Sequence, residues 1–447
     1  MPPPGSKLPT ADRISHGMPH RLLVLSNGHG EDLIALQVMR ALKARQPGLQ
    51  LLVMPLVGVG SAFDAAESQG LLQRYGPRRP LPSGGFSNQS VSGLLQDLGA
   101  GLVQLSWRQW RLVRRWGRGG QPVLAVGDLL PLLLAWAGGG PYGFVGTPKS
   151  DYTWRSPPPA GWAASPLADA YHHCKGSEWD PWEWALMGRP RCRLVAVRDA
   201  LTARGLRGHR VRATAPGNPM MDGFSAFPPC PAWLHGQRRL LLLPGSRAPE
   251  ALRNLERLLG ALPHGPSGDL PAALVGQSLT VLVALGSFPS PQQLAPLLAG
   301  AGFRPQSVPA GSGAASAWGR GAVRLLLGPQ QFARWAPLAE VGLATAGTAT
   351  EQLVGLGVPA LSLPGPGPQF KAAFARRQSR LLGGAVEPCH SCAELAQKLA
   401  VLLGNAARRQ QLGAIGRQRM GPCGGSVRLA ELVQAHLLSP TGPGGRG

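Results

Sequence analysis

Short apolar strands that end in glycine turns and lead into helices recur along this chain, and this repeat constrains the fold most. Arg21–Ser26 is expected to be such a strand, Asn27–Gly30 its turn, and Glu31–Ala44 a helix with its apolar side chains on one face. Leu49–Leu56 opens a second unit, which turns at Gly58–Gly60. Strand, turn and helix in this order are typical of doubly wound parallel sheets. The sequence therefore predicts an α/β protein.

The length of 447 residues predicts two such domains, because one hydrophobic core rarely organises a chain of this size. A Pro-rich break after residue 216 separates two series of strand and helix units. We expect a flexible tail over 1–20, a first domain over 21–216, a linker over 217–238, a second domain over 239–420, a terminal helix over 421–437 and a flexible tail over 438–447.

Further elements follow from apolar periodicity and from glycine and proline punctuation. Two long segments stand out: Val91–Trp116 reads as one helix, and Trp154–Trp184 as an insertion with poor periodicity. The expected strands are Val123–Val126, Leu194–Val197, Val211–Ala213, Arg239–Leu243, Leu279–Leu285, Ala322–Leu327 and Pro359–Leu363, and the expected helices include Leu129–Trp136, Ala393–Leu403 and Ala406–Leu437.

The net charge of +23 permits anionic partners without specifying one. Only six basic residues are Lys, and the abundance of Arg, Gly, Pro and Ala is also what a GC-rich genome favours. We expect no signal peptide, no spanning helix, reduced cysteines and a cytoplasmic location. Cys389 and Cys392 have the spacing of half a zinc site, but no second pair follows, so no metal site is expected.

Basic and aromatic residues alternate at the end of the expected helix Val91–Trp116. Two interpretations stay open: the helix rests on an anionic membrane, or its Trp side chains pack inward while its Arg side chains stay in water. The residues concerned are Trp107, Trp110 and Trp116 with Arg108, Arg111, Arg114, Arg115 and Arg118.

Candidate site residues of the first half follow the ends of strands, where open α/β sheets bind ligands. Gly28 and Gly30 allow a close approach to a phosphate or sugar, and the alternative is that they merely make the turn. His29 and Asp128 are candidate bases, and Asp128 is as well placed to cap the following helix. Thr147 and Lys149 belong to a polar cluster suited to a hydroxylated or phosphorylated acceptor.

The second half presents a phosphate site at the start of a helix. Thr345, Gly347, Thr348 and Thr350 bring hydroxyl and backbone N–H groups to that helix start, and Glu351 lies in its first turn. Ordinary helix capping explains this pattern equally well. Gly245 and Ser246 form a turn that ends at Arg247, a guanidinium suited to bidentate binding of phosphate.

Several of these motifs occur together in the order seen in one known family. Leu243–Arg247, Ala346–Glu351 with Gly357–Pro359 behind it, and Gly217–Asp222 resemble lipid-A-disaccharide synthase. Ser26–Asp32 and Gly365–Phe370 are closer still to the synthase-related proteins of cyanobacteria. The resemblance covers most of residues 21 to 435 and is stronger in the second half.

This resemblance implies a GT-B glycosyltransferase with two Rossmann-like domains facing across a cleft. Arg247 and Thr348 would hold the UDP pyrophosphate, Glu351 the ribose hydroxyls and Gln369 the donor sugar, and the terminal helix would cross back to the first domain. One departure concerns the acceptor side. The loop around His29 is nearer to that of the peptidoglycan enzyme that adds N-acetylglucosamine to a lipid-linked precursor.

The expected reaction is an inverting transfer of a GlcNAc-like sugar from a UDP-sugar to a lipid-linked acceptor at the inner membrane face. His29 or Asp128 would accept the proton, and no cofactor or metal is expected, since no Asp-x-Asp motif is present. The alternatives are a UDP-sugar 2-epimerase and a non-catalytic nucleotide-sugar-binding protein. Charge alone suggests nucleic-acid binding, and no specific nucleic-acid partner is expected.

Overall fold

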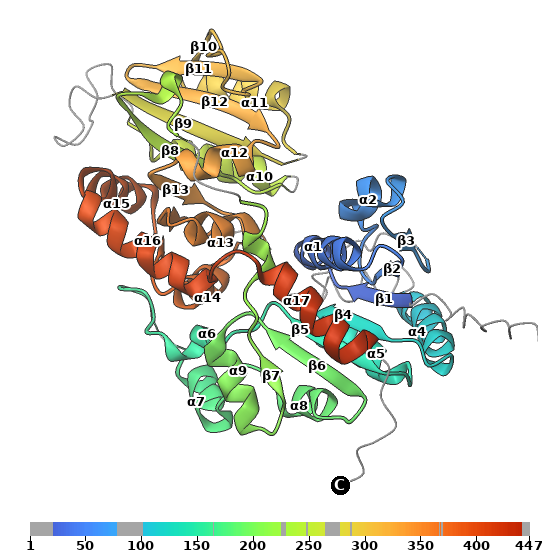
Figure 1. Cartoon of the computed structure of the whole chain (residues 1–447). Coiled ribbons are helices and arrows are strands. Elements are labelled where there is room, and N and C mark those ends of the chain that lie inside the picture. Colours follow the sequence, from blue (N-terminus) through green and yellow to red (C-terminus); the bar gives the residue numbers. More distant parts are fainter. Residues whose placement is uncertain are drawn as a thin grey trace, which may run out of the picture.

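Two sheets with helices on both faces make up the protein, one in each half of the chain (Figure 1). The computed structural model describes residues 21–77, 102–163, 165–224, 229–246, 249–263, 278–286, 288–365, 367 and 370–439. The predicted α/β architecture is confirmed.

The first sheet has seven parallel strands in the order β3-β2-β1-β4-β5-β6-β7. The order reverses between β1 and β4, and ligands bind at the carboxyl ends of strands beside such a reversal. The strands are β1 (Arg21–Ser26), β2 (Gln50–Pro55), β3 (Gln73–Arg74), β4 (Val123–Gly127), β5 (Tyr142–Gly146), β6 (Cys192–Val197) and β7 (Ala213–Thr214).

The helices of the first domain differ from expectation in one place. Of the expected helix Val91–Trp116, residues 102–116 lie within the described part of the chain and belong to α4 (Leu102–Arg118). The expected insertion Trp154–Trp184 contains short helices. The helices are α1 (His29–Arg45), α2 (Asp64–Ser68), α4, α5 (Leu129–Ala137), α6 (Tyr152–Arg155), α7 (Pro166–Lys175), α8 (Pro181–Met187) and α9 (Ala200–Gly208).

The second sheet has the order β10-β11-β12-β9-β8-β13-β14-β15 and reverses between β8 and β13. β10 and β11 are an antiparallel edge that the sequence did not indicate, because both are short and carry Arg, Pro or Gly rather than an apolar run. The strands are β8 (Gln237–Leu243), β9 (Ser278–Leu285), β10 (Arg304–Gln306), β11 (Ser316–Arg320), β12 (Val323–Pro329), β13 (Val341–Ala344), β14 (Ala360–Ser362) and β15 (Val386–Pro388).

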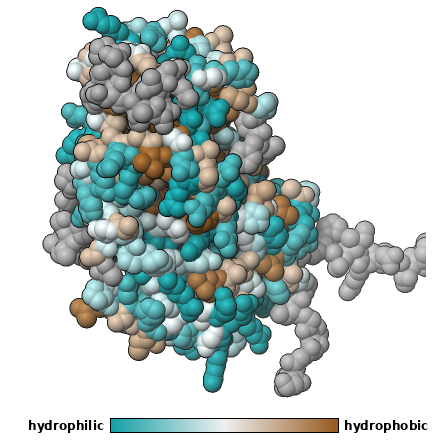
Figure 2. Space-filling view, turned by 90° about the vertical axis from the view of Figure 1, so that its left-hand side faces the viewer, coloured by the Kyte–Doolittle hydropathy of each residue, from teal (hydrophilic) through white to brown (hydrophobic). Residues whose placement is uncertain are grey.

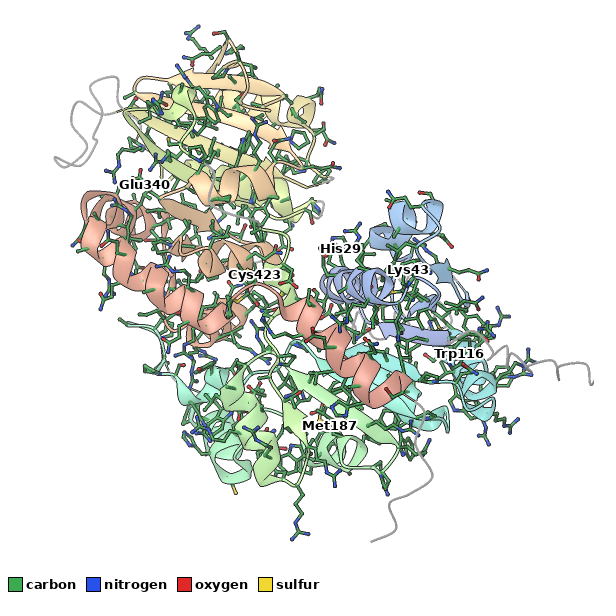
Figure 3. The ribbon with its side chains drawn as sticks, in the orientation of Figure 1. His29, Lys43, Trp116, Met187, Glu340 and Cys423 are labelled. Atoms are coloured by element: carbon green, nitrogen blue, oxygen red, sulfur yellow. The ribbon has the colours of Figure 1, made fainter. Side chains whose placement is uncertain are left out.

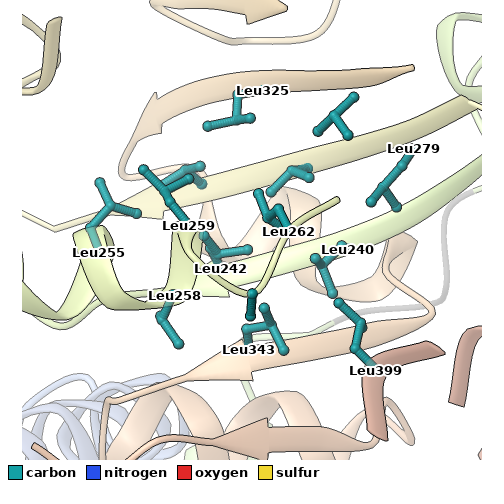
Figure 4. Close-up of a cluster of buried hydrophobic side chains, with 14 of the residues drawn as sticks. Leu240, Leu242, Leu255, Leu258, Leu259, Leu262, Leu279, Leu325, Leu343 and Leu399 are labelled. Atoms are coloured by element: carbon teal, nitrogen blue, oxygen red, sulfur yellow. The ribbon is translucent and has the colours of Figure 1, made fainter. Parts of the chain in front are cut away.

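Leucine-rich strands form the core of this second domain. Leu240 and Leu242 of β8 pack with Leu279 of β9, Leu325 of β12 and Leu343 of β13 on one face of the sheet (Figure 4). The helices are α10 (Glu250–Leu259), α11 (Pro291–Gly300), α12 (Phe332–Trp335), α13 (Thr348–Gly355), α14 (Ala372–Leu381), α15 (Cys392–Gly404), α16 (Ala406–Met420) and α17 (Gly425–Val433).

The expected single helix Ala406–Leu437 is wrong: α16 and α17 are separate helices. Gly421 and Gly424 have φ values of 75° and 90°, which break the helix between them. Asp222 caps α17, because its carboxylate accepts hydrogen bonds from the backbone N–H groups of Gly424, Gly425 and Ser426 at 2.6 to 3.1 Å. Cys423, at this break, lies between the two domains (Figure 3).

The terminal helix α17 packs on the first domain although its chain comes from the second. Leu429, Ala430 and Val433 are buried against α1 and the first sheet, and Leu438, in the segment expected as a tail, joins them. Removing these side chains from water holds the domains together at this point.

Arginines of α14 make a second junction between the domains. Nη1 of the buried Arg380 donates to both carboxylate oxygens of Asp169 in α7, at 2.8 and 2.9 Å. Nη2 donates to the Trp154 carbonyl and Nε to the Ser156 carbonyl. The insertion Trp154–Trp184, to which the sequence assigned no regular structure, therefore connects α14 to the first domain.

The outer surface is mostly polar on the face shown in Figure 2, where hydrophobic patches are small and scattered. Leu167 of α7 and Trp182 of α8 are among the exposed large apolar side chains. Within the described residues, no helix is both long enough and apolar enough to cross a membrane.

Candidate active site

The glycine loop after β1 faces the second domain. Gly28 has φ 113° and precedes α1, which begins at His29, an exposed residue at the head of that helix (Figure 3). A Cβ atom on Gly30 would lie 3.2 Å from Thr348 Oγ1 of the other domain. Gly28 is thus required by the turn, and Gly30 by the close approach of the two domains.

Asp128 follows β4 and caps the next helix. Its Oδ1 accepts hydrogen bonds from the backbone N–H of Leu130 at 3.1 Å and from Asn27 Nδ2 at 2.7 Å. The capping role that the sequence allowed is therefore present. The bond to Asn27 also joins the ends of β1 and β4 at the strand-order reversal.

Thr147 and Lys149, predicted together on the acceptor side, point to different places. Thr147 Oγ1 lies 3.4 Å from Glu31 Oε1, within the site. Lys149 Nζ pairs instead with Glu183 at 2.5 Å and Asp180 at 3.3 Å, on the α8 side of the domain. Because both carboxylates hold its ammonium group there, the structure does not place Lys149 with the other site residues.

Glu31 is a site residue that the sequence analysis counted only as part of a helix. Its half-buried side chain lies among the glycine loop, Gly127 and Thr147. Burial is the main cause that raises the pKa of Glu31 from 4.5 to about 7, and the negative charge of Asp128 adds to it. Its position directly after a glycine turn at a strand end was the signal that could have revealed it.

On the second domain, Gly245 and Ser246 follow β8, and Gly245 has φ 91°. They lie at the reversal between β8 and β13, where the backbone N–H of Thr345 donates to the Leu243 carbonyl at 2.9 Å. Arg247 and Gln369 lie outside the described residues.

The start of α13 is the proposed phosphate site, and its hydroxyl groups differ in their partners. Thr345 Oγ1 donates to the Leu243 carbonyl and Thr350 Oγ1 to the Ala346 carbonyl, so both serve the local backbone. Gly347 is the residue before the helix, and Thr348 is its first residue. Thr348 is therefore the hydroxyl of this turn that faces the opposite domain.

The helix α13 is held rigidly by α16 behind it. A Cβ atom on Gly416 would lie 2.4 Å from the Val354 carbonyl oxygen, and one on Gly413 would lie 2.2 Å from the Gly357 carbonyl oxygen. Only glycine permits so close a crossing of the two segments. This packing fixes the direction in which the start of α13 points.

Glu351 forms an ion pair across the cleft. Its Oε2 accepts a hydrogen bond from Arg198 Nη2 at 2.9 Å, and the two side chains are only 14% and 7% exposed. Arg198 follows β6 and lies 3.5 Å from the Thr147 carbonyl, so it connects the acceptor side with α13. The sequence analysis did not single out Arg198.

The Trp and Arg residues of α4 divide between core and surface. Trp116 is buried and Trp110 is half-buried against the first core, whereas Trp107 is 53% exposed beneath the Arg111 guanidinium. The five arginines of this helix are exposed. The inward packing of Trp110 and Trp116 is therefore present, and contact of the exposed side chains with a membrane stays a prediction.

Within the described part of the chain, no group of three or more His, Cys, Asp or Glu side chains is arranged to hold a metal ion. Cys389 is buried, which raises the pKa of its thiol to about 12, and Cys392 Sγ contacts the Arg257 carbonyl.

Known proteins share this architecture but not a recognisable sequence. No protein-family model and no curated protein matches the chain. A protein assigned as a UDP-N-acetylglucosamine 2-epimerase from Listeria monocytogenes has a TM-score of 0.52 at 11% identity, over 93% of this chain and 96% of its own. MurG from Acinetobacter baumannii gives 0.51 at 16%, over 93% and 100%. The calicheamicin glycosyltransferase CalG4 gives 0.54 at 14%, over 94% and 99%.

These likenesses, together with two doubly wound sheets meeting at their carboxyl edges, define the GT-B fold. At 11–16% identity they establish the fold alone.

Proposed function

We propose that this protein is a glycosyltransferase that moves a sugar, GlcNAc-like in type, from a UDP-sugar to a lipid-linked hydroxyl group. One observation carries the proposal: the start of α13, with Thr348 and Glu351, directly faces the glycine loop and the carboxyl groups at the ends of β1 and β4. A diphosphate site and a proton acceptor would thus lie on opposite walls of one cleft.

The donor side would act through positive charge and N–H dipoles. The diphosphate of UDP would lie at the start of α13, against Thr348 and the backbone N–H groups there, with Gly245 and Ser246 beside it. Arg247 would add a guanidinium and Gln369 a contact to the sugar. These groups would stabilise the leaving diphosphate as the anomeric carbon is attacked, without a metal ion.

Glu351 would bind the ribose hydroxyls. Its Oε2 is occupied by Arg198 in the structure, so a nucleotide would have to share this carboxylate or displace the guanidinium. The co-ordered motifs also lead us to propose that the chain belongs with the synthase-related proteins of cyanobacteria that resemble lipid-A-disaccharide synthase.

Incubation with labelled UDP-sugars and a total lipid extract tests the proposal. Transfer predicts label in the lipid fraction, dependent on the protein and on the UDP-sugar. Unlabelled lipid combined with tight UDP binding would instead support a non-catalytic binding protein.

A UDP-sugar 2-epimerase is the second candidate, and one observation favours it. Epimerisation needs acid and base groups gathered around the sugar, and Glu31, Asp128 and His29 are gathered at the same wall of the cleft. A sugar nucleotide whose configuration changes in the absence of any lipid would identify this activity.

The helix α4 is the proposed contact with an anionic membrane at its cytoplasmic face. Its exposed arginines and Trp107 supply charge and an interfacial aromatic side chain. Sedimentation with phosphatidylglycerol vesicles, but not with phosphatidylcholine vesicles, should be lost in R111E/R115E and kept in the matched control R204E/R207E on α9. Equal loss in both variants would mean that net charge alone governs binding.

A further inference from the structure

Glu31 lies in an enclosed position on the first-domain wall of the cleft. A Cβ atom on Gly28 would lie 3.2 Å from its Oε2, and one on Gly127 would lie 3.4 Å from its Cγ. Thr147 Oγ1 lies 3.4 Å from its Oε1. The side chain is therefore fitted between the glycine loop and the ends of β4 and β5, and it remains half-buried rather than sealed.

Asp128, one of the two bases predicted from sequence, already takes part in two hydrogen bonds. Its Oδ1 atom accepts them from Asn27 Nδ2 and from the backbone N–H of Leu130 in α5. Protonating this carboxylate would weaken both bonds and the helix cap. His29, the other predicted base, is exposed at the head of α1. His29 is thus more exposed than Glu31, and Asp128 already serves a structural role.

The surroundings of Glu31 favour proton exchange near neutral pH. Asp128 faces it from the start of α5 and Asp32 from its own helix, and both charges oppose its ionisation. Thr147 after β5 and the backbone N–H of Glu31 favour the ionised form. Arg198, beyond Thr147, is paired with Glu351. A carboxyl group balanced in this way can both accept a proton and release it.

We propose that Glu31 is the catalytic base that removes the proton from the acceptor hydroxyl, an inference that rests on the proposed transfer function. The acceptor oxygen bonds to the anomeric carbon, and the bond from that carbon to the diphosphate oxygen breaks with its electron pair leaving on UDP. The hydroxyl proton passes to the Glu31 carboxylate and then to water. Asn27 and Asp128 are positioning residues that fix the loop from which Glu31 projects.

The test compares Glu31→Gln, Glu31→Asp and Asp128→Asn in the lipid transfer assay between pH 5.5 and 9. We expect Glu31→Gln to lower kcat about 100-fold or more, the usual effect of losing a general base. The rise of kcat with pH near 7 should vanish with it. Glu31→Asp should recover part of the rate, and Asp128→Asn should change kcat less than Glu31→Gln does.

UDP affinity, measured by calorimetry, separates this role from a folding defect, because Glu31→Gln should bind UDP as the wild type does. Transfer by the wild type that persists in Glu31→Gln with the same pH profile would overturn the assignment of the base alone. Absence of transfer by the wild type with every UDP-sugar would overturn the proposed function and this inference together.

Discussion

The two domains touch in two different ways, on the side of α14 and α17 and on the side of α13. On the α14 and α17 side, which we call the hinge side, α17 buries apolar side chains in the first domain, and the buried Arg380 satisfies a carboxylate and two carbonyl groups. On the cleft side the described contacts include one ion pair, Arg198 with Glu351, and the approach of Gly30 to Thr348. The buried hinge contacts resist separation, whereas the ligand that we propose would replace the cleft contacts.

The largest effect is expected from breaking the hinge at Arg380. Replacing Arg380 by Ala leaves Asp169 and the carbonyls of Trp154 and Ser156 without their donors inside the protein. We expect a loss of about 3–5 kcal/mol in the free energy of unfolding, measured in urea. Arg376→Ala is the matched control on the same helix, since Arg376 is only half-buried and donates to one carbonyl, that of Ala163. Equally small losses of stability in both variants would mean that the hydrogen bonds of Arg380 to the first domain contribute little to the free energy of unfolding.

The next effect concerns the cleft and depends on pH. The pKa of Glu31 is raised from 4.5 to about 7 in the folded protein, so folding favours its protonated form. The stability this contributes is complete below about pH 4.5 and is lost as the pH rises through 7. At pH 8, Glu31→Gln should therefore unfold less readily than the wild type, by up to about 3 kcal/mol.

Urea titrations at pH 5 and pH 8 measure this difference. Glu256→Gln, a change at an exposed glutamate of α10, is the control and should leave the pH dependence unaltered. If Glu31→Gln and the wild type had the same free energy of unfolding at both pH 5 and pH 8, this result would contradict the environment described for Glu31.

A smaller effect is expected at the cap of the terminal helix. Asp222→Ala removes the acceptor for three backbone N–H groups at the start of α17. We expect a loss of about 1–2 kcal/mol in stability, whereas Asp222→Asn, which keeps an acceptor oxygen, should lose less. If alanine and asparagine behaved alike, the three hydrogen bonds would not be what fixes α17.

The smallest change in UDP affinity is expected from removing the ion pair between Arg198 and Glu351. Arg198→Ala should lower the free energy of unfolding, because the pair is largely buried and the Glu351 carboxylate would lose its partner. It should also tighten UDP binding about fivefold, since ribose hydroxyls would no longer compete with a guanidinium for Glu351. Weaker UDP binding in this variant would show that Arg198 helps to hold the nucleotide.

Much of the fold and of the proposed donor side could be predicted from local patterns, because strands, turns and helix starts depend on residues that are neighbours in the sequence. The turn at Gly28 and the helix that starts at Thr348 follow directly from glycine and from small polar residues beside apolar strands. The strand order and the edge pair β10 and β11 were beyond such reasoning, since short polar strands carry no periodic signal.

The partners of charged side chains were harder to predict, since they depend on how the domains meet. Lys149 was expected in the site but is held by Asp180 and Glu183, which lie more than thirty positions along the chain. Glu31 and Arg198 were missed for the same reason. The sequence around each of them indicates no particular role, and only the three-dimensional arrangement shows which groups surround them.

The central claim is that the cleft between α13 and the glycine loop is a UDP-sugar site, and the UDP affinity of Glu351→Ala tests it most directly. The matched control is Glu340→Ala, which removes a carboxylate of the second domain that pairs with Arg238 and Arg409 away from the cleft (Figure 3). Calorimetry should show UDP binding weakened at least tenfold, about 1.4 kcal/mol, in Glu351→Ala and unchanged in Glu340→Ala. Wild-type UDP affinity in Glu351→Ala would contradict the account.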